Sequence, residues 1–279
     1  MTTAHKHEYV EPVPDLAATA EIIRTPCGDG TMVWRSWGNG PVLALLHGGT
    51  GSWRHWAANI ATLAKTHRLL VADHPGLGDS DLPHDPISPE SLGAIAAAGI
   101  GYIIGQTRYD ICGFSFGSMI SGHVAAQRPT QVKTLTIVGP AALGTPRHAV
   151  LLEKVRSKHG EERRAANREN LARFMFHDPA KIDDRAIDIQ DLNTKLARLK
   201  SKGFAHTSSL RDATGRTPAK LTAIWGSGDV TAYPDVETRI AALRAVRPDA
   251  GLVIIPDAGH WVAYEAAAAF DAALLGAIG

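Results

Sequence analysis

Residues 109–119 read YDICGFSFGSM, and this stretch decides the fold. The apolar run 109–112 leads directly into GFSFG at 113–117, and a helical pattern follows. A G-x-S-x-G string between a strand and a helix predicts a nucleophile elbow, a sharp turn that presents the serine hydroxyl. Glycines on both sides suit such a turn because the strand and the helix must pass closely. An ordinary glycine turn is the alternative, since a short motif alone is not specific.

A second glycine-rich turn follows an earlier apolar run, where residues 45–51 read LLHGGTG. Backbone N–H groups at such glycines can approach a carbonyl oxygen and stabilise the oxyanion of a tetrahedral intermediate. We expect the amides of Gly49 and Phe116 to be these donors, with Gly48 lying against the substrate and His47 bracing the loop. A turn that binds no ligand is the alternative.

An acid and a base follow the elbow at the ends of later strand-like runs. Asp229 comes after the run 221–225, and His260 comes after the run 252–255. Open α/β sheets hold their sites at the carboxyl ends of strands, in the chain order Ser, Asp, His for this architecture. A serine hydroxyl needs a base, and that base needs a partner that fixes its tautomer. We predict Ser115 as nucleophile, His260 as general base and Asp229 as the orienting acid.

The rest of the chain alternates short apolar runs with helical segments, which is typical of a parallel sheet covered on both faces. An Asp-Gly pair at 29–30 predicts an antiparallel hairpin ahead of that sheet. We predict an α/β fold with a mostly parallel central sheet, helices on both faces and an inserted helical cap. The predicted strands are 21–25, 31–37, 42–46, 69–72, 109–112, 132–138, 221–225 and 252–255. The predicted helices are 53–64, 89–105, 116–126, 235–246 and 263–278.

Three parts of the chain differ in character. Residues 1–20 show no clear period and are interpreted as an N-terminal arm. Residues 141–216 are charged and helical in pattern, which indicates a helical cap subdomain inserted after the sixth strand. The core domain is then formed by 21–140 and 217–279. No internal repeat is present, which excludes a solenoid.

Composition narrows the function classes. The 279 residues suffice for one large α/β domain, and 29 Lys and Arg against 28 Asp and Glu disfavour a nucleic-acid partner. The two cysteines, Cys27 and Cys112, are expected to be buried thiols in a reducing compartment. No signal-like segment and no run of about 18 apolar residues is found. We therefore expect a soluble cytoplasmic protein without a membrane partner that acts on a small molecule, and a homodimer stays open.

No metal or cofactor is expected from the remaining motifs. His55, His74 and His123 lack a second ligand at metal-binding spacing. The Gly-Leu-Gly at 76–78 lacks the third glycine and the following acid of a dinucleotide site.

The motifs HGG at 47–49, DHPGLGDS at 73–80, the Ser115 elbow, Asp229 and Gly259-His260 together resemble the α/β-hydrolase superfamily. The resemblance spans nearly the whole chain and implies a Ser-His-Asp hydrolase. The superfamily includes esterases, lipases, thioesterases, peptidases, carbon-carbon bond hydrolases and some lyases, and the fold does not choose among them. Its dehalogenases and epoxide hydrolases carry an aspartate at the elbow, so the serine disfavours both.

One branch of the superfamily gives a more detailed resemblance. The stretch 259–265 and the residues Phe-His-Asp at 176–178 are similar to hydrolases that cleave meta-cleavage products of aromatic degradation. That branch places an arginine on a cap helix for the substrate carboxylate, whereas Gln190 aligns there and Arg185 fits only after a register shift. Ester hydrolysis is therefore the main prediction and carbon-carbon hydrolysis the alternative. Amide or thioester cleavage and a non-catalytic ligand-binding protein also stay open.

Several side chains are candidates for substrate contact. Trp261 and Tyr264 follow the predicted base, while Phe176 and Gln190 lie in the predicted cap. Gln190 and Asn193 lie three residues apart and could present amides to a substrate, although a solvated helix face explains the spacing equally well. Further aromatic residues in the cap, Phe174 and Phe204, are interpreted as core residues.

Overall fold

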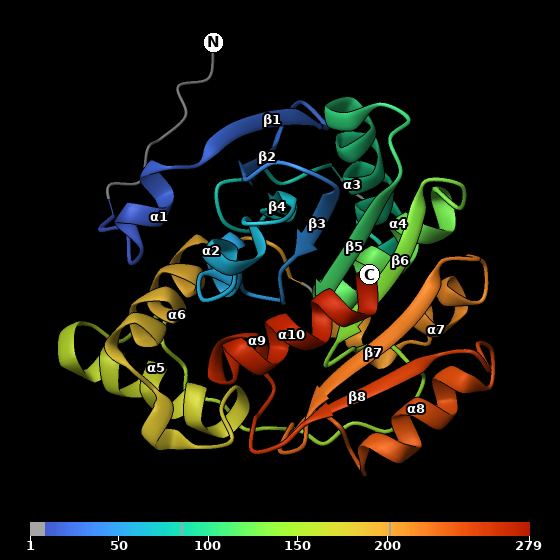
Figure 1. Ribbon diagram of the computed structural model, residues 1–279. Helices are drawn as coiled ribbons and strands as arrows, with labels where there is room; N and C mark the ends of the chain where they lie inside the picture. Colours follow the sequence, from blue (N-terminus) through green and yellow to red (C-terminus); the bar gives the residue numbers. More distant parts are fainter. Residues whose placement is uncertain (1–8, 85, 201) are drawn as a thin grey trace.

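A computed structural model describes residues 9–84, 86–200 and 202–279 (Figure 1). Within these residues a sheet of eight strands runs in the order β1-β2-β4-β3-β5-β6-β7-β8. The strands are β1 (Glu21–Cys27), β2 (Gly30–Trp37), β3 (Val42–Leu46), β4 (Arg68–Ala72), β5 (Tyr109–Phe114), β6 (Val132–Val138), β7 (Lys220–Gly226) and β8 (Gly251–Ile255).

The sheet begins antiparallel and continues parallel. β1 pairs antiparallel with β2 as predicted, but the turn is formed by Gly28 and Asp29, one residue before the predicted Asp-Gly pair, and Gly28 has φ +59°. β2 is antiparallel to β4, and from β4 to β8 every neighbouring pair is parallel. The predicted mostly parallel α/β sheet is confirmed, and the carboxyl ends of its parallel strands lie along one edge.

Helices connect the strands. The α-helices are α1 (Pro14–Ala18), α2 (Ile60–Leu63), α3 (Pro89–Ile104), α4 (Phe116–Gln127), α5 (Gly160–Phe174), α6 (Asp184–Leu196), α7 (Ser209–Thr214), α8 (Val236–Arg244), α9 (Val262–Glu265) and α10 (Ala267–Ile278). Short 3-10 helices are η1 (Trp53–Trp56), η2 (Pro179–Lys181) and η3 (Lys202–His206).

Two predicted helices are interrupted. The prediction of one helix over 53–64 is wrong, because η1 and α2 are separate and Asn59 lies between them. The Asn59 amide donates to Ala263 O and to Asp271 Oδ1, both at 2.8 Å, so a tertiary contact holds this position. The predicted helix 263–278 is likewise divided at Ala266, whose φ of −130° is not helical.

The two faces of the sheet bury separate hydrophobic cores. One core contains side chains of α3, α4, α7 and α8, and the other contains side chains of η1, α2, α5, α6, α9 and α10. Alternate residues of β5 enter the two cores, as Ile111 and Cys112 do. Because both faces are covered, the parallel strands are continuous apolar runs, which is why the sequence pattern located them.

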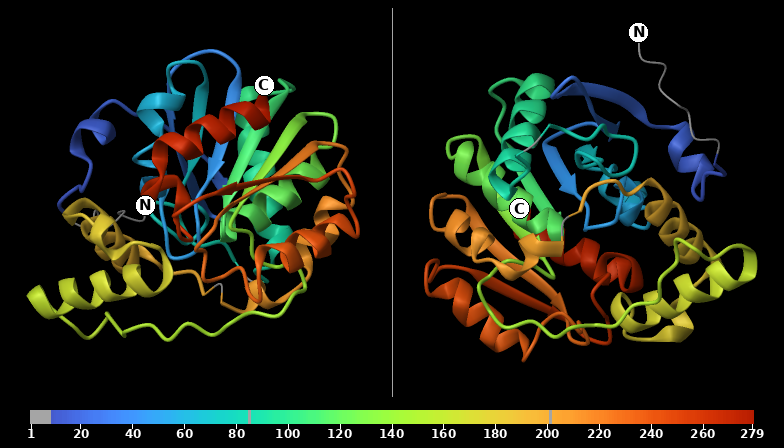
Figure 2. Two further views of the ribbon diagram at one scale, coloured as in Figure 1. Left: turned by 60° about the horizontal axis from the view of Figure 1, so that its bottom comes forward. Right: turned by 180° about the vertical axis from the view of Figure 1, so that it is seen from behind.

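The chain between β6 and β7 is helical. No strand is present in the described part of 139–219, and α5 packs against α6 beside α9, outside the sheet (Figures 1 and 2). Ion pairs of Arg163 with Asp191 and of Arg164 with Asp184 join α5 to α6. This helical insertion places α5 and α6 over the carboxyl-end edge of the sheet.

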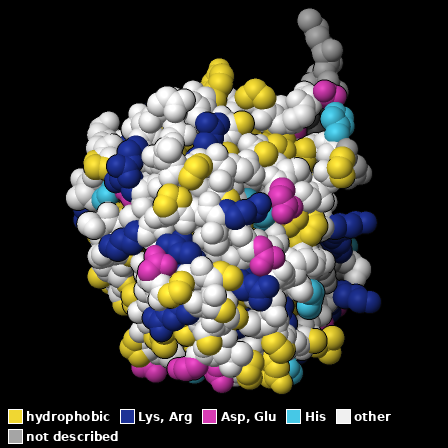
Figure 3. All heavy atoms as spheres, turned by 90° about the vertical axis from the view of Figure 1, so that its right-hand side faces the viewer, with side chains coloured by type: hydrophobic (Ala, Val, Ile, Leu, Met, Phe, Trp, Pro, Cys, Tyr) yellow, Lys and Arg dark blue, Asp and Glu magenta, His cyan; other side chains and the backbone are white. Residues whose placement is uncertain are grey.

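The surface in view carries mixed charges, and both cysteine thiols are buried. Basic, acidic and hydrophobic side chains are distributed over the face shown in Figure 3. Cys27 and Cys112 are buried and free, and burial raises the pKa of the Cys27 thiol to about 11. Among the described helices, none is both long enough and apolar enough to cross a bilayer.

The buried carboxyl of Asp271 on α10 should make the unfolding free energy of the protein depend on pH. Burial raises its pKa to about 6, whereas an unfolded aspartate titrates near about 4. The folded state therefore holds this proton more tightly, and stability is lost as the pH rises between these values. We expect the unfolding free energy of the wild type, relative to Asp271→Asn, to fall between pH 4 and pH 6 and to level off above. Urea unfolding at several pH values measures this difference, and a difference that does not change with pH would contradict it.

Candidate active site

Ser115 lies at the turn between β5 and α4 with φ 52° and ψ −109°, a conformation that L-residues rarely adopt. Two hydrogen bonds to nearby main-chain carbonyls hold this turn. The Ser115 N–H donates to Val138 O at 2.7 Å, and the Ser118 hydroxyl donates to Gly113 O at 2.6 Å. The strained backbone leaves the Ser115 side chain partly exposed at the strand end.

The flanking glycines are required by close backbone approach. A Cβ at Gly113 would lie 2.2 Å from Gly117 O, and a Cβ at Gly117 would lie 2.1 Å from Leu46 O. These distances are far below van der Waals contact, and backbone atoms cannot move aside cheaply. The G-x-S-x-G pattern thus has a physical reason in the packing of α4 against β5 and β3.

The predicted serine, histidine and aspartate meet at the carboxyl ends of β5, β7 and β8. His260 Nε2 lies 3.0 Å from Ser115 Oγ, and His260 Nδ1 lies 2.9 Å from Asp229 Oδ2. The His260 side chain is 2% exposed and that of Asp229 is fully buried. A continuous chain of hydrogen bonds therefore runs from a buried carboxylate through an imidazole to a partly exposed hydroxyl.

Asp229 is held in its ionised form. Burial opposes ionisation, but His260 and Thr231 outweigh it and keep the pKa of the Asp229 carboxyl below its usual value. The Thr231 N–H donates to Asp229 Oδ1 at 2.8 Å, and the Thr231 hydroxyl lies 3.2 Å from His260 Nδ1. Sequence reasoning missed Thr231, although an Asp two residues before it is the spacing of an Asx turn.

Gly139, at the end of β6, is a second residue that the sequence analysis missed. It has φ +48°, and a Cβ there would lie 2.9 Å from both Asp229 Oδ2 and His260 Nδ1. The absence of a side chain at this position gives the Asp–His pair its space. No local pattern distinguishes it from the other glycines of the chain.

Buried histidines brace the glycine-rich loop after β3. His47 Nδ1 lies 2.7 Å from Gly48 O, and the His74 N–H donates to His47 Nε2 at 2.9 Å. His55 Nδ1 accepts the Gly48 N–H at 3.2 Å. Burial lowers the pKa of His47 and His55 to about 3, so both are neutral near pH 7. The bonds of His47 agree with the bracing role expected for it, whereas the hydrogen bond from Gly48 to His55 was not predicted.

The predicted oxyanion donors lie on the two turns beside Ser115. Within the described residues, the N–H groups of Gly49 and Phe116 donate to no protein acceptor. Gly48 donates to His55 instead, and a Cβ at Gly48 would lie 2.9 Å from the Phe114 ring. Two main-chain donors are thus unengaged at the turns that flank the hydroxyl.

The aromatic candidates after His260 lie in the core. Trp261 is 0% exposed and donates through Nε1 to His55 O at 2.9 Å. Phe176 is 3% exposed and packs edge-on against Trp261 and Tyr264. The Tyr264 hydroxyl donates to Asp183 Oδ1 at 2.8 Å. These contacts make the cluster a joint between α9 and the helical insertion.

The polar candidates of α6 differ from each other. Gln190 is half-buried, while Asn193 is fully buried and accepts the Ser52 hydroxyl through Oδ1 at 2.6 Å. A solvated face is therefore the wrong explanation for Asn193. Arg185 is exposed and lies 3.9 Å from Asp183. The Phe174 ring, at the end of α5, lies 5.1 Å from that of His260.

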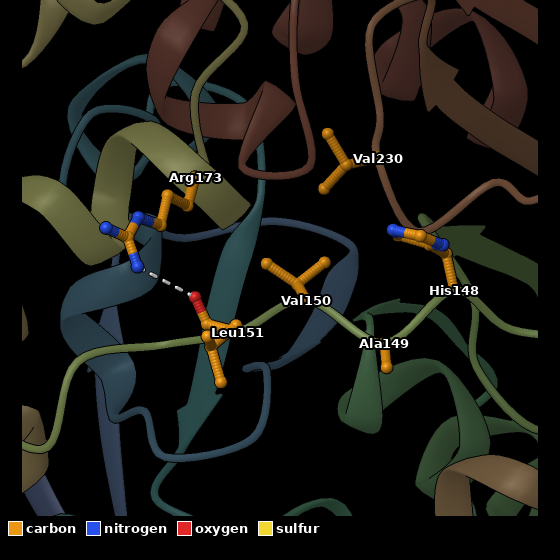
Figure 4. Close-up of a pocket in the computed structure, with 6 residues that line it drawn as sticks. All are labelled: His148, Ala149, Val150, Leu151, Arg173 and Val230. Carbon is orange, nitrogen blue, oxygen red and sulfur yellow. Dashed lines mark hydrogen bonds between the residues drawn. The ribbon is translucent and has the colours of Figure 1, made fainter.

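A surface pocket of about 480 Å³ opens between the segment 148–151, Arg173 and Val230 (Figure 4). Val230 follows Asp229 directly in the chain, and Arg173 directly precedes Phe174. Arg173 donates to Leu151 O at 3.1 Å, and this bond joins two of the residues that line the pocket. No group of three or more His, Cys, Asp or Glu in the described chain could hold a metal ion. The pocket is lined by His148, Ala149, Val150, Leu151, Arg173 and Val230.

A family model described as alpha/beta hydrolase fold matches residues 41–267. The chain therefore belongs to the α/β-hydrolase fold family. Over 242 residues it is 27% identical to the dihydrolipoyllysine-residue acetyltransferase component of the acetoin cleaving system of Pseudomonas putida, a match covering 82% of this chain and 60% of that protein. This chain thus spans less than two thirds of that relative.

Two further similarities concern proteins of similar length. Over 250 residues the chain is 25% identical to 2-hydroxy-6-oxononadienedioate/2-hydroxy-6-oxononatrienedioate hydrolase of Comamonas testosteroni, covering 84% of this chain and 86% of that protein. The crystal structure of naproxen esterase (carboxylesterase NP) from Bacillus subtilis has a TM-score of 0.74 at 18% identity and covers 92% and 90% of the two chains.

Replacing Gly139 tests how closely the Asp229–His260 pair is packed. Gly139→Ala should cost about 1 to 2 kcal/mol for the left-handed backbone and about 1 to 3 kcal/mol more for the collision with the pair. Gly160→Ala is the matched control, because Gly160 has φ +49° and a Cβ there meets nothing within 4 Å. Urea unfolding of both variants gives the comparison. Equal losses of stability would show that the space beside His260 is not restricted.

Proposed function

We propose that the protein is a serine hydrolase that cleaves a carboxylic ester of a small molecule through an acyl-enzyme. The observation that carries this proposal is the unbroken hydrogen-bond chain from Asp229 through His260 to Ser115. Ser115 is the nucleophile, His260 the general base and Asp229 the acid that fixes the imidazole tautomer.

The mechanism follows from the positions of these groups. His260 Nε2 accepts the Ser115 proton as Oγ attacks the carbonyl carbon of the ester, and the alcohol leaves with that proton. Water then attacks the acyl-enzyme, its proton passes to His260, and the acid product departs as Ser115 regains its hydrogen. Asp229 stays ionised throughout and stabilises the imidazolium, in keeping with its lowered pKa.

The oxyanion of each tetrahedral intermediate is stabilised by the amides of Gly49 and Phe116. Support comes from the two unengaged N–H groups on the turns beside Ser115. The neutral, buried His55 holds the neighbouring Gly48 amide away from the substrate, so the loop presents Gly49 in a fixed orientation. Fixed donors cost no reorganisation during the reaction, which is why such sites are effective.

The substrate enters between the core domain, 21–140 and 217–279, and a helical cap formed by 141–216, with 1–20 as an N-terminal arm. Supporting this division, the pocket lies between the cap segment 148–151, Arg173 at the end of α5 and Val230 of the core. The two free, buried cysteines support a reducing, cytoplasmic location.

Carbon-carbon bond hydrolysis is the second candidate. The Comamonas testosteroni relative, a hydrolase of dienedioate and trienedioate compounds by its name, favours it. In that case His260 would first help the substrate to tautomerise before Ser115 attacks. The half-buried amide of Gln190, where a cation would suit a substrate carboxylate, favours the neutral ester.

A fluorophosphonate probe tests the catalytic assignment. The wild type should be labelled at Ser115, because His260 activates the hydroxyl, and Ser115→Ala and His260→Ala should not be labelled. Each of these variants should lower kcat by about a million-fold, and Asp229→Asn by about ten-thousand-fold. Intact-protein mass spectrometry and ester kinetics measure both effects, with circular dichroism as the control for folding. A wild type that resists the probe and hydrolyses nothing would indicate a non-catalytic ligand-binding protein.

Substrate comparison distinguishes the two bond types. Short p-nitrophenyl esters should be turned over with a much higher kcat/KM than a ring-fission dienone, because no cation lies at Gln190 to hold the carboxylate of the dienone. Spectrophotometric assays of both substrates give the ratio. A preference for the dienone would overturn ester hydrolysis. If neither substrate is turned over, amides and thioesters are the remaining substrate classes.

A further inference from the structure

The carboxylate of Glu265, at the end of α9, accepts hydrogen bonds from main-chain N–H groups of two separate segments. Oε1 accepts from the Asp178 N–H at 2.8 Å, and Oε2 accepts from the Gly259 N–H at 2.6 Å. The His177 N–H lies 2.9 Å from Oε2 and 3.1 Å from Oε1. One side chain thus joins the segment that follows α5 to the residue directly before His260.

The same two segments are fitted closely at other points. The Trp261 N–H donates to Met175 O at 2.8 Å, so the peptides on both sides of His260 are attached to 175–178 or to Glu265. A Cβ at Gly259 would lie 2.5 Å from His177 N, which leaves the strand-to-helix turn no room to shift. His260 is therefore held from its main chain as well as by Asp229.

The end of α5 also contacts the imidazole directly. Phe174, its last residue, places its ring 5.1 Å from the His260 ring in an edge-on arrangement. Movement of α5 would consequently be transmitted to His260 both through this ring and through the Glu265 contacts. Within the described residues, Glu265 itself has no hydrogen bond to Ser115 or Asp229.

We propose that Glu265 is a positioning residue that sets the place of the His260 imidazole and couples it to α5 of the helical insertion. The inference rests on the proposed function, because it assigns His260 as the base. Three N–H donors converge on the group, and an ionised carboxylate can accept all of them. An amide has one acceptor oxygen, and its NH₂ group would face an N–H donor without a bond.

The test variant is Glu265→Gln, which keeps the size of the side chain and removes the second acceptor. The rate of fluorophosphonate labelling at Ser115 and kcat for a p-nitrophenyl ester should both fall, by roughly 10- to 100-fold, because displacing a catalytic group by about 1 Å costs this much. KM should change little, because Glu265 does not contact the substrate. Glu265→Asp, which keeps the charge, should recover part of the loss.

Glu237→Gln is the matched control. Glu237 lies exposed in the first turn of α8 and has no hydrogen bond from its side chain to the described chain. This variant makes the same chemical change without touching either segment, so labelling and kcat should equal those of the wild type. Hydrogen exchange of peptides covering 175–178 and 257–261 should quicken in Glu265→Gln alone.

The outcomes separate the possible roles. Faster exchange or a lower Tm in Glu265→Gln with unchanged labelling and kcat, measured well below the Tm, would show a purely structural role and overturn the inference. If Glu265→Gln does not fold, Glu265→Asp takes its place and must lower kcat without raising KM. A wild type that is not labelled at Ser115 would instead remove the proposed function on which the inference rests.

Discussion

The constraint on which the rest of the structure depends is the backbone of Ser115, held at a positive φ between β5 and α4. This conformation requires the carboxyl end of β5 to lie against β3 and β6, because Val138 O accepts the Ser115 N–H and Leu46 O lies over Gly117. The central place of β5 in the sheet supplies those neighbours. Strain of this kind persists only where the surrounding structure over-determines it.

Buried histidines and a buried carboxylate surround the elbow. His47, His55 and His74 are buried, and their lowered pKa values keep them neutral while they hold main-chain groups of the loop. Asp229 is buried as well, yet it stays ionised because His260 and Thr231 supply the compensating contacts.

The parts of this architecture that local sequence determines were predictable, and the parts that depend on tertiary contact were not. The parallel strands are apolar on both faces, so their runs located them, and the serine, aspartate and histidine stand at the ends of such runs. The break between η1 and α2 depends on Asn59 reaching Asp271, far along the chain. Likewise, nothing local marks Gly139 as the neighbour of His260.

The aromatic stretch after His260 connects the base to the helical insertion. Trp261 donates its indole N–H to His55 O and packs against Phe176 and Tyr264, so it transmits the position of the helical insertion to the residue beside His260. Val230 lines the surface pocket, whereas the Phe174 ring lies beside the His260 imidazole. The end of α5 therefore reaches the imidazole through Phe174 and the pocket through Arg173.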